Sequence, residues 1–255
     1  MKNLLRFEFR KLRRQKSFYI SLIIMAAMIL IAGISYMILL KYADTLEEMA
    51  GGKLLPKSSV AFLLTFVSTS MFSMLSAIFA SITVCDDYES QIVKNIFARG
   101  YSRTDHYFAK LIYVFTTTTV MFLFALVVSA VAGVAFFGVE DITGRAVILL
   151  LGQYVVSMSG VAMSFAIAAA IKKLGAAIAA NIVVPIVIPL ILQLGDSILA
   201  LKDFKIQSIW ADSFLTSLTD ISVGTGRIVA CILGSVAYVA VFVFAGYAAS
   251  RKTEV

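Results

Sequence analysis

Charged side chains are scarce in this 255-residue chain: Asp, Glu, Lys and Arg make up 15% of it, whereas hydrophobic residues make up 60%. With a mean hydropathy of +0.94, this composition lies outside the range of soluble globular domains. A net charge of +7 would suit a nucleic-acid partner, but the basic residues gather between apolar runs without an aromatic-interleaved nucleic-acid motif, which argues against nucleic acid. The sequence therefore predicts an all-α integral membrane protein.

Reactive groups are equally rare. The chain has no Gly-x-x-x-x-Gly-Lys-Ser/Thr phosphate loop, so we expect no ATP site of that kind on it. The single histidine, His106, has no acidic or cysteine companions at metal-ligand spacing and is predicted to lie on the surface. Cys85 and Cys231 are predicted near opposite membrane faces, where they cannot pair. We expect no catalytic, cofactor or metal site, and an energy source on a partner.

Six apolar stretches are long enough to cross a hydrocarbon core of about 30 Å, because a helix rises about 1.5 Å per residue. They are residues 18–40, 60–84, 111–138, 146–171, 174–194 and 228–250. The connections predicted to be cytosolic hold 15 of the 22 Lys and Arg residues, so both termini are expected inside. The spans contain no clear ionisable residue near their middle, which argues against an ion-coupled transporter. The sequence predicts one transmembrane domain over residues 1–255.

The N-terminal segment 1–17 is strongly basic and contains one acid, Glu8. On a helix, its apolar residues share a narrow face and its basic residues occupy a flank. The apolar residues are Met1, Leu5, Phe9 and Leu12, and the basic ones are Lys2, Arg6, Arg10, Arg13 and Arg14. The pattern is typical of an elbow helix on the inner leaflet of the bilayer, where each basic residue near anionic lipid contributes about 1 kcal/mol. A signal for membrane orientation explains the same charges.

The longest polar insertion between two apolar runs on the predicted cytosolic side is residues 85–110. Asp86 and Glu89 have the spacing of a capping box, so we expect a helix over residues 86–99 to begin as the preceding span ends. Gly100 suits the left-handed residue that stops a helix. Ser102 with Asp105 repeats the capping pattern and predicts a second helix that continues into the third span.

The predicted helix 86–99 is amphipathic. Its apolar face consists of Tyr88, Ile92, Val93, Ile96 and Phe97, and its polar rim of Glu89, Lys94, Arg99 and Arg103. An interfacial helix that lies on lipid headgroups has the same pattern. Periodicity alone therefore leaves a lipid surface and a protein partner open.

This insertion resembles the intracellular loop of ATP-binding cassette (ABC) type 2 permeases, in particular the bacterial branch of bacitracin and lantibiotic-immunity exporters. The resemblance rests on an acidic residue, Ile92 and Asn95 in a short helix, the run Gly100-Tyr101-Ser102-Arg103, and then Tyr107 and Lys110. In that family the loop is a coupling helix, which docks on a soluble ATPase subunit that carries the ATP and Mg. The resemblance thus implies a bacterial plasma-membrane protein that pairs with a second permease subunit, identical or paralogous.

The function implied by the resemblance is that of the transmembrane subunit of an ATP-driven exporter. Its substrate would be amphipathic, a peptide, lipid or drug moved outward, and the resembled branch is associated with antimicrobial-peptide resistance. The alternative is a non-transporting membrane scaffold that anchors a cytosolic partner through the same basic arm and loop.

Two further features lie in the C-terminal half. Asn181, Pro185 and Pro189 share the fifth span, where prolines four residues apart predict a kink or break, with Asn181 as a partner for a freed carbonyl. Residues 195–227 predict one or two interfacial or re-entrant helices on the outer side, with Trp210 at headgroup depth. The aspartates of that segment suit either a cationic substrate or a solvated face; they are Asp196, Asp203, Asp212 and Asp220.

Overall fold

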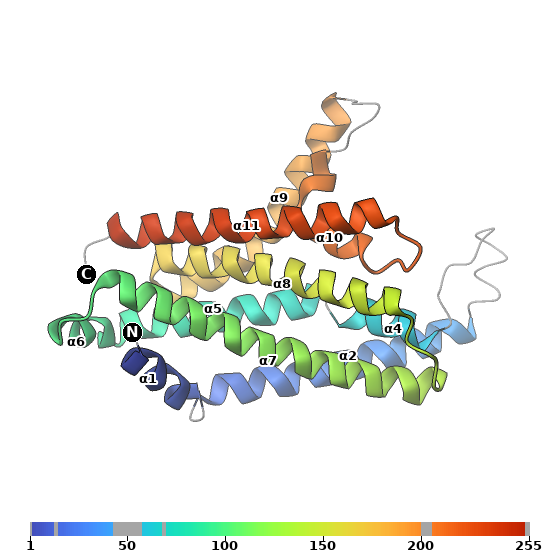
Figure 1. The fold of residues 1–255 in the computed structure, drawn as a ribbon, viewed down its shortest axis with the longest axis horizontal. Helices are drawn as coiled ribbons and strands as arrows, with labels where there is room; N and C mark the ends of the chain where they lie inside the picture. The colour runs from blue at the N-terminus through green and yellow to red at the C-terminus, as the bar shows by residue number, and fades with distance from the viewer. Residues whose placement is uncertain (1, 13–14, 43–57, 68–69, 200–205, 253–255) are drawn as a thin grey trace.

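The computed structural model describes residues 2–12, 15–42, 58–67, 70–199 and 206–252. Within them the chain forms ten α-helices and one turn of 3-10 helix, η1, which lie mostly along one direction as a bundle (Figure 1). The helices are α1 (Lys2–Leu12), α2 (Lys16–Lys41), α4 (Ser59–Phe66), α5 (Ser70–Glu89), α6 (Ile92–Ala98), α7 (Arg103–Phe137), α8 (Gly144–Ile171), α9 (Leu174–Leu199), α10 (Ala211–Ser217) and α11 (Thr225–Lys252), with η1 at Ile206–Ile209. The prediction of an all-α membrane domain agrees with this architecture.

Among the described residues, five helices are long and apolar enough to cross a membrane: α2, α7, α8, α9 and α11. They coincide with five of the six predicted spans. The predicted second span, residues 60–84, falls on α4 and α5, and residues 68–69 between them lie outside the described part of the chain. A single helix over residues 60–84 therefore stays a prediction.

A buried side chain of α8 binds the backbone at the C-terminal end of α4. A helix that ends inside a membrane leaves carbonyl groups without their amide partners, and these need other donors. Gln153 of α8 is fully buried, and its amide nitrogen donates to the carbonyl oxygens of Leu64 at 2.8 Å and Leu218 at 3.1 Å. One glutamine in the fourth span thus serves the ends of both α4 and α10.

Replacing Gln153 by leucine is expected to destabilise the bundle. The substitution keeps most of the side-chain volume but leaves the carbonyls of Leu64 and Leu218 without this donor, which costs about 1–3 kcal/mol. The apparent melting temperature in detergent should fall by several degrees. Gln193→Leu on the exposed face of α9 is the matched control. Equal melting temperatures for the two variants would contradict the assigned role.

Helix α8 is the centre of the bundle, in contact with α4, α5, α7, α9, α10 and α11. Its C-terminal half is rich in small residues, which allow neighbouring helices to approach closely. A Cβ atom added at Gly246 of α11 would lie 3.0 Å from the Cα of Ala166 and 2.7 Å from the hydroxyl oxygen of Tyr107. The backbones of α8 and α11 are therefore as close as their glycine and alanine residues permit.

The end of the bundle away from α6 is built from short connections. Glu140, between α7 and α8, accepts hydrogen bonds from the Ser59 hydroxyl at 3.1 Å and the Val60 amide at 3.3 Å, and so caps α4. The predicted outer element appears as η1 and α10, and α10 buries Phe214 and Leu215 against the bundle. Trp210 is buried and packs edge-on against Tyr238 of α11. Asp203 and the acidic and glycine-rich part of the first loop lie outside the described residues.

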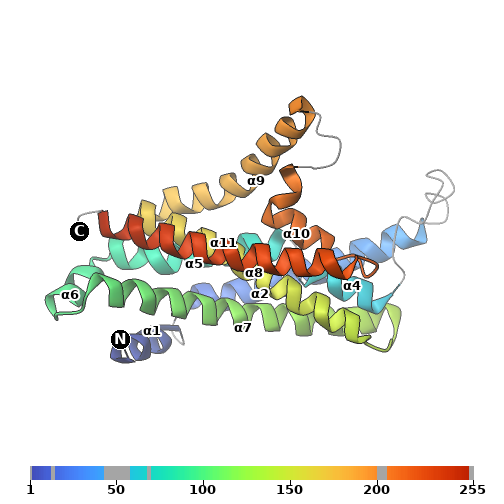
Figure 2. The same ribbon diagram turned by 45° about the horizontal axis from the view of Figure 1, so that its top comes forward.

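The opposite end of the bundle gathers the basic parts of the chain. Figure 1 shows α1, α6 and the C-terminal end of α11 at this same end. The turn between α8 and α9 lies there too, and it carries Lys172 and Lys173. Figure 2 shows that the last turns of α9 lean away from the long helices, and Asp196 there accepts hydrogen bonds from the first amides of η1. The first turns of α9 lie beside α5 and α8.

Candidate functional site

The connection from α5 to α7 differs at its start from the predicted capping box. Asp86 does not begin a helix: α5 continues through it to Glu89, and the chain then turns at Gln91, whose φ of 58° is left-handed. The new helix, α6, covers Ile92–Ala98 rather than residues 86–99. The physical reason is that Asp86 and Asp87 bind lysine side chains instead of backbone amides, so α5 has no cause to stop there.

The other end of the connection follows the prediction. Gly100 has a φ of 83°, the left-handed conformation that ends α6 and that favours glycine. The Ser102 hydroxyl accepts a hydrogen bond from the Asp105 amide at 3.0 Å and donates one to the Asp105 carboxylate at 2.9 Å. α7 therefore begins at Arg103, as the second capping pattern predicts.

α6 turns its two most apolar positions inward. Val93 is 1% exposed and Ile96 is 8% exposed, and Ile96 forms a small cluster with Leu4 of α1 and Ala109 of α7. Ile92 and Phe97 are half-buried at the edge of this contact, and Phe97 packs against the His106 ring. The exposed side of α6 carries Lys94, Asn95, Ala98 and Arg99. Part of the predicted apolar face thus anchors α6 to its own protein.

A buried group of charges, which we call the ion cluster, lies next to α6 and consists of Glu8, Lys11, Asp87, His106 and Lys110. Lys110 Nζ lies 2.8 Å from Glu8 Oε2 and 2.5 Å from Asp87 Oδ2, and all three side chains are at most 2% exposed. Lys11 Nζ lies 2.7 Å from Asp87 Oδ1 and 3.0 Å from Asp86 Oδ2. The cluster therefore ties α1, α5 and α7 together with charge-assisted hydrogen bonds, the stronger kind.

Asp87 is the centre of the ion cluster. Burial by itself raises the pKa of Asp87, but the nearby His106, Lys110 and Lys11 outweigh it and hold the pKa of that carboxyl well below its usual range. Burial likewise lowers the pKa of Lys11, whereas the carboxylates of Asp87 and Asp86 outweigh it and raise that pKa. Asp87 and Lys11 are therefore both charged throughout the neutral pH range.

His106 is buried rather than exposed, which corrects the prediction that it lies on the surface. It is 4% exposed, its Nε2 lies 3.9 Å from Asp87 Oδ2, and its ring packs edge-on against Tyr88 and Phe97. His106 and Lys110 are one helical turn apart, so the face of α7 that turns Lys110 toward Asp87 also turns His106 inward. The sequence contains a weak signal for this arrangement, a lone acid within a basic arm and a lysine at the start of a span.

The elbow residues fall on the opposite side of α1. Arg6 and Arg10 are exposed, as predicted, and Arg13 and Arg14 lie outside the described residues. The inward face of α1 is Leu4 and Glu8, not the predicted stripe, in which Phe9 is 37% exposed and Leu5 and Leu12 are only half-buried. The ion pair between Glu8 and Lys110 determines this rotation, because a lone buried charge is far costlier than an exposed phenylalanine.

Glu89 and Tyr88 join the α5–α6 turn to the α8–α9 turn. A Glu89 carboxylate oxygen accepts a hydrogen bond from the Leu174 amide at 2.7 Å, at the N-terminus of α9. Lys172 Nζ lies 4.9 Å from the centre of the Tyr88 ring. On the other side, the Arg103 guanidinium lies 6.0 Å from the centre of the Phe97 ring and donates to the Arg251 carbonyl at 3.5 Å. The turn around α6 is therefore connected to α9 and α11 as well.

The proline pair in α9 does not break the helix, which runs from Leu174 to Leu199 with Pro185 and Pro189 inside it. The Asn181 amide group makes a different contact from the one predicted. Its nitrogen donates to the Ser81 hydroxyl of α5 at 2.8 Å and to the Ser164 carbonyl of α8 at 3.1 Å. Asn181 thus attaches the first half of α9 to the bundle.

Cys85 and Cys231 are both buried free thiols, in agreement with the prediction that they do not pair. In the part of the chain that the structure describes, no three His, Cys, Asp or Glu side chains converge as metal ligands do. The carboxylates of the ion cluster are instead occupied by lysines. The arrangement at this end of the bundle is suited to holding helices together and to presenting α6.

Comparison with known proteins identifies the family. The family model for the ABC-2 family transporter protein matches residues 4–196, which is 193 of the 255 residues and includes α1, the ion cluster and α6. A search of the curated proteins finds no match to the chain. Permeases of this family are transmembrane subunits that lack an ATPase domain and carry no cofactor, and ATP is bound by the partner ATPase subunits. This multi-pass protein therefore belongs to the ABC-2 family and is the membrane component of an ABC-2 type transporter.

Proposed function

We propose that this chain is the permease subunit of an ATP-driven exporter and that α6, with the turn before it, docks on a separately encoded ATPase. One observation carries the proposal: a seven-residue helix protrudes between two long helices, is anchored from inside by Val93 and Ile96, and leaves a polar face uncovered. Such a helix transmits a push on its outer face to the helices that hold it.

The docking surface proposed here is the uncovered face of α6. It comprises Lys94, Asn95, Ala98 and Arg99, with Ile92, Phe97 and Tyr88 at its half-buried edge. Glu89 and Arg103, which the sequence pattern puts on a polar rim, lie at the two ends of this surface and bond to the α9 and α11 ends. Two cationic side chains with no other charge beside them on α6 suit a partner groove that is acidic.

Movement of α6 is transmitted to the membrane-spanning helices through covalent connections and ion pairs. α6 is covalently joined to α5 and α7, and the ion cluster adds α1 to the same unit. The Glu89 carboxylate also connects this unit to α9, because it accepts a hydrogen bond from the Leu174 amide. Closure of the ATPases would therefore displace α1, α5, α6 and α7 as one body, and would change access to a path between permease subunits.

The topology that supports this function has six crossings. α1 and the end of α11 lie at the same end of the bundle (Figure 1), and an even number of crossings is needed to return there. Five described helices are each long and apolar enough to cross the membrane alone, so α4 and α5 together form the sixth crossing. The basic residues at this end favour the cytosolic side for both termini, in a bacterial plasma membrane if the resemblance to the bacitracin and lantibiotic-immunity branch holds.

The assembly proposed is a dimer of permease subunits, identical or paralogous, with two ATPases. The long helices expose many large apolar side chains, among them Ile23 at 69%, Val131 at 65% and Phe244 at 71%, which suits lipid and a second permease subunit. An amphipathic peptide, lipid or drug is the substrate class, and antimicrobial-peptide resistance is the role that the branch suggests.

The proposal is tested by purifying the tagged chain from its native membrane in mild detergent. We expect a phosphate-loop ATPase in near-stoichiometric amount, and ATP hydrolysis by the purified complex. The control is the same purification after a high-salt wash, which should release the ATPase if charged contacts on α6 hold it. A chain that purifies alone, while another ABC complex from the same membrane stays intact, would refute the proposal.

A further inference from the structure

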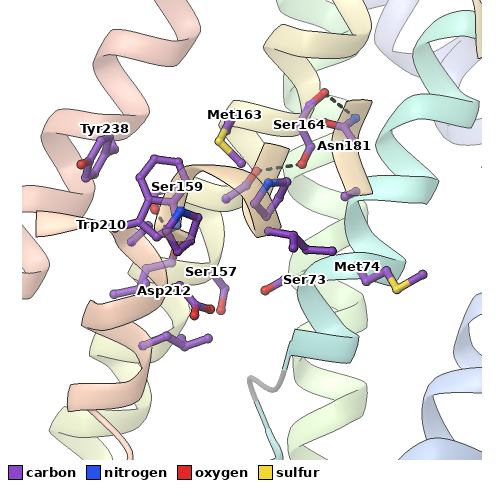
Figure 3. A pocket seen from close by; sticks show the side chains of 18 of the residues that line it. Ser73, Met74, Ser157, Ser159, Met163, Ser164, Asn181, Trp210, Asp212 and Tyr238 are labelled. Carbon is purple, nitrogen blue, oxygen red and sulfur yellow. Dashed lines mark hydrogen bonds between the residues drawn. The ribbon is translucent and has the colours of Figure 1, made fainter. Parts of the chain in front are cut away.

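A cavity of about 440 Å³ lies between α5, α8, α9, α10 and α11. Figure 3 shows its side chains: Trp210 and Tyr238 stand on one side, Met74 and Asn181 on the other, and Asp212 and Ser157 between them toward one end. The cavity is of the size that holds a drug-sized ligand. It belongs to one subunit and is far from α6, so the docking of an ATPase does not account for it.

The described wall of the cavity contains an acidic side chain and no basic one. Among the described residues that line the cavity, Asp212 is the one acidic side chain, and none of them is a lysine, arginine or histidine. The Asp212 carboxylate forms no ion pair with the residues that the structure describes. Asp212 is exposed at the edge of the cavity, and an unpaired carboxylate there attracts a cationic ligand by its charge.

The wall beside Asp212 is aromatic. The Tyr238 and Phe242 rings stack with centres 5.9 Å apart, and Trp210 packs edge-on against Tyr238 at 6.4 Å. The Tyr238 hydroxyl is held by the Ile209 carbonyl at 3.1 Å, which keeps the ring in place. Aromatic faces attract organic cations, and tryptophan does so most strongly. A carboxylate and an aromatic wall, with no basic side chain among the described lining residues, form a typical site for an organic ammonium group.

Two buried polar atoms that line the cavity have no partner. The hydroxyl oxygen of Ser157 and the amide oxygen of Asn181 form no hydrogen bond, although the two side chains are only 5% and 2% exposed. An unpartnered buried polar atom is destabilising, so such atoms are usually satisfied by water or ligand. Both can accept a hydrogen bond from an ammonium or hydroxyl group. The cavity thus offers acceptors. Most of its remaining wall is apolar, as at Met163 and Pro185, and the further polar lining residues are Ser73, Ser76, Ser159, Ser164 and Gln193.

We propose that this cavity binds a lipophilic organic cation of drug size. Its ammonium group lies between Asp212, Ser157 and the aromatic wall of Trp210 and Tyr238, and its apolar body lies against α9 toward Asn181. Binding is a property of this chain alone. That the same cation is also transported rests on the proposed function of the previous subsection.

The test uses the complete chain in lipid nanodiscs, without an ATPase. Trp210 is the one tryptophan of the protein, so its fluorescence reports directly on the cavity. The probe is imipramine, a tricyclic amine that is protonated at pH 7, and the matched ligand is carbamazepine, a tricyclic of the same ring type without charge. Empty nanodiscs give the correction for partition into lipid.

We expect imipramine to change Trp210 emission saturably and carbamazepine to leave it unchanged. Asp212→Asn should weaken imipramine binding roughly tenfold, whereas Asp141→Asn, an exposed aspartate between α7 and α8, should not. Ser157→Ala should also weaken binding while leaving the melting temperature equal or higher, since it removes an unpartnered hydroxyl. This second variant separates loss of binding from loss of fold.

Three results would overturn the inference: no saturable response to imipramine, equal responses to the two tricyclic ligands, or equal imipramine affinity in Asp212→Asn and Asp141→Asn. None of them bears on the ATPase, so failure of the inference is distinguishable from failure of the proposed transporter.

Discussion

Lys110→Met is expected to release α1 from the bundle. The substitution removes the cation between Glu8 and Asp87 and leaves Glu8 buried without a partner, since Lys11 pairs with Asp87 and Asp86. Removing one partner of a buried ion pair costs about 3–5 kcal/mol. α1 has no other buried charge contact with α7, so the loss should appear first as detachment of this helix.

The measurement is limited trypsin digestion in detergent, followed by the apparent melting temperature. Cleavage after Arg6 and Arg10 should become much faster in Lys110→Met, and the melting temperature should fall. Lys173→Met, at an exposed position of the same end, is the matched control. Indistinguishable digestion of the two variants would show that the ion cluster does not hold α1.

A double-mutant cycle separates the pair from the cost of each substitution. Glu8→Gln removes the charge that Lys110→Met leaves uncompensated, so the double variant should be more stable than the sum of the single effects predicts. Additive effects would mean that Glu8 and Lys110 do not interact despite a separation of 2.8 Å.

Charge reversal on α6 is expected to abolish coupling to an ATPase without unfolding the permease. Lys94 and Arg99 are exposed, and α6 is held by Val93 and Ile96, so Lys94→Glu/Arg99→Glu should leave the melting temperature unchanged. Like charges that face each other across an interface cost several kcal/mol, so co-purified ATPase and ATP-driven transport should fall by at least about tenfold.

The control for α6 is Lys173→Glu/Arg251→Glu, which reverses two exposed charges at the same end of the bundle outside α6. It should retain the ATPase. If both double variants lose it equally, docking is not specific to α6. Ile96, which the sequence pattern puts on the docking face, is unsuitable as a probe: Ile96→Asp would bury a carboxylate against Leu4 and Ala109 and disturb the fold itself.

Local sequence determined most of the secondary structure. Apolar length predicted six spans, and five of them coincide with single long helices, because a helix with no water to bond must be long and continuous to cross a membrane. Gly100 and the Ser102 cap determined where α6 ends and α7 begins, since these signals act within one turn. The composition and the loop pattern were sufficient to indicate the ABC-2 family, which the match over residues 4–196 confirms.

Tertiary structure decided what depends on partners far apart in the chain. Asp86 has the spacing of a helix cap, yet a lysine 75 residues earlier binds it, and α5 runs on. Gln153 lies in an apolar run, and the sequence shows no partner for its side chain. In the structure its amide nitrogen donates to the Leu64 carbonyl at the end of α4. Glu8 and Lys110 are 102 positions apart, and their pairing turns α1 and buries His106. Spacing along a sequence describes contacts within a few turns of one helix, whereas the pairing of buried charges depends on which helices pack together.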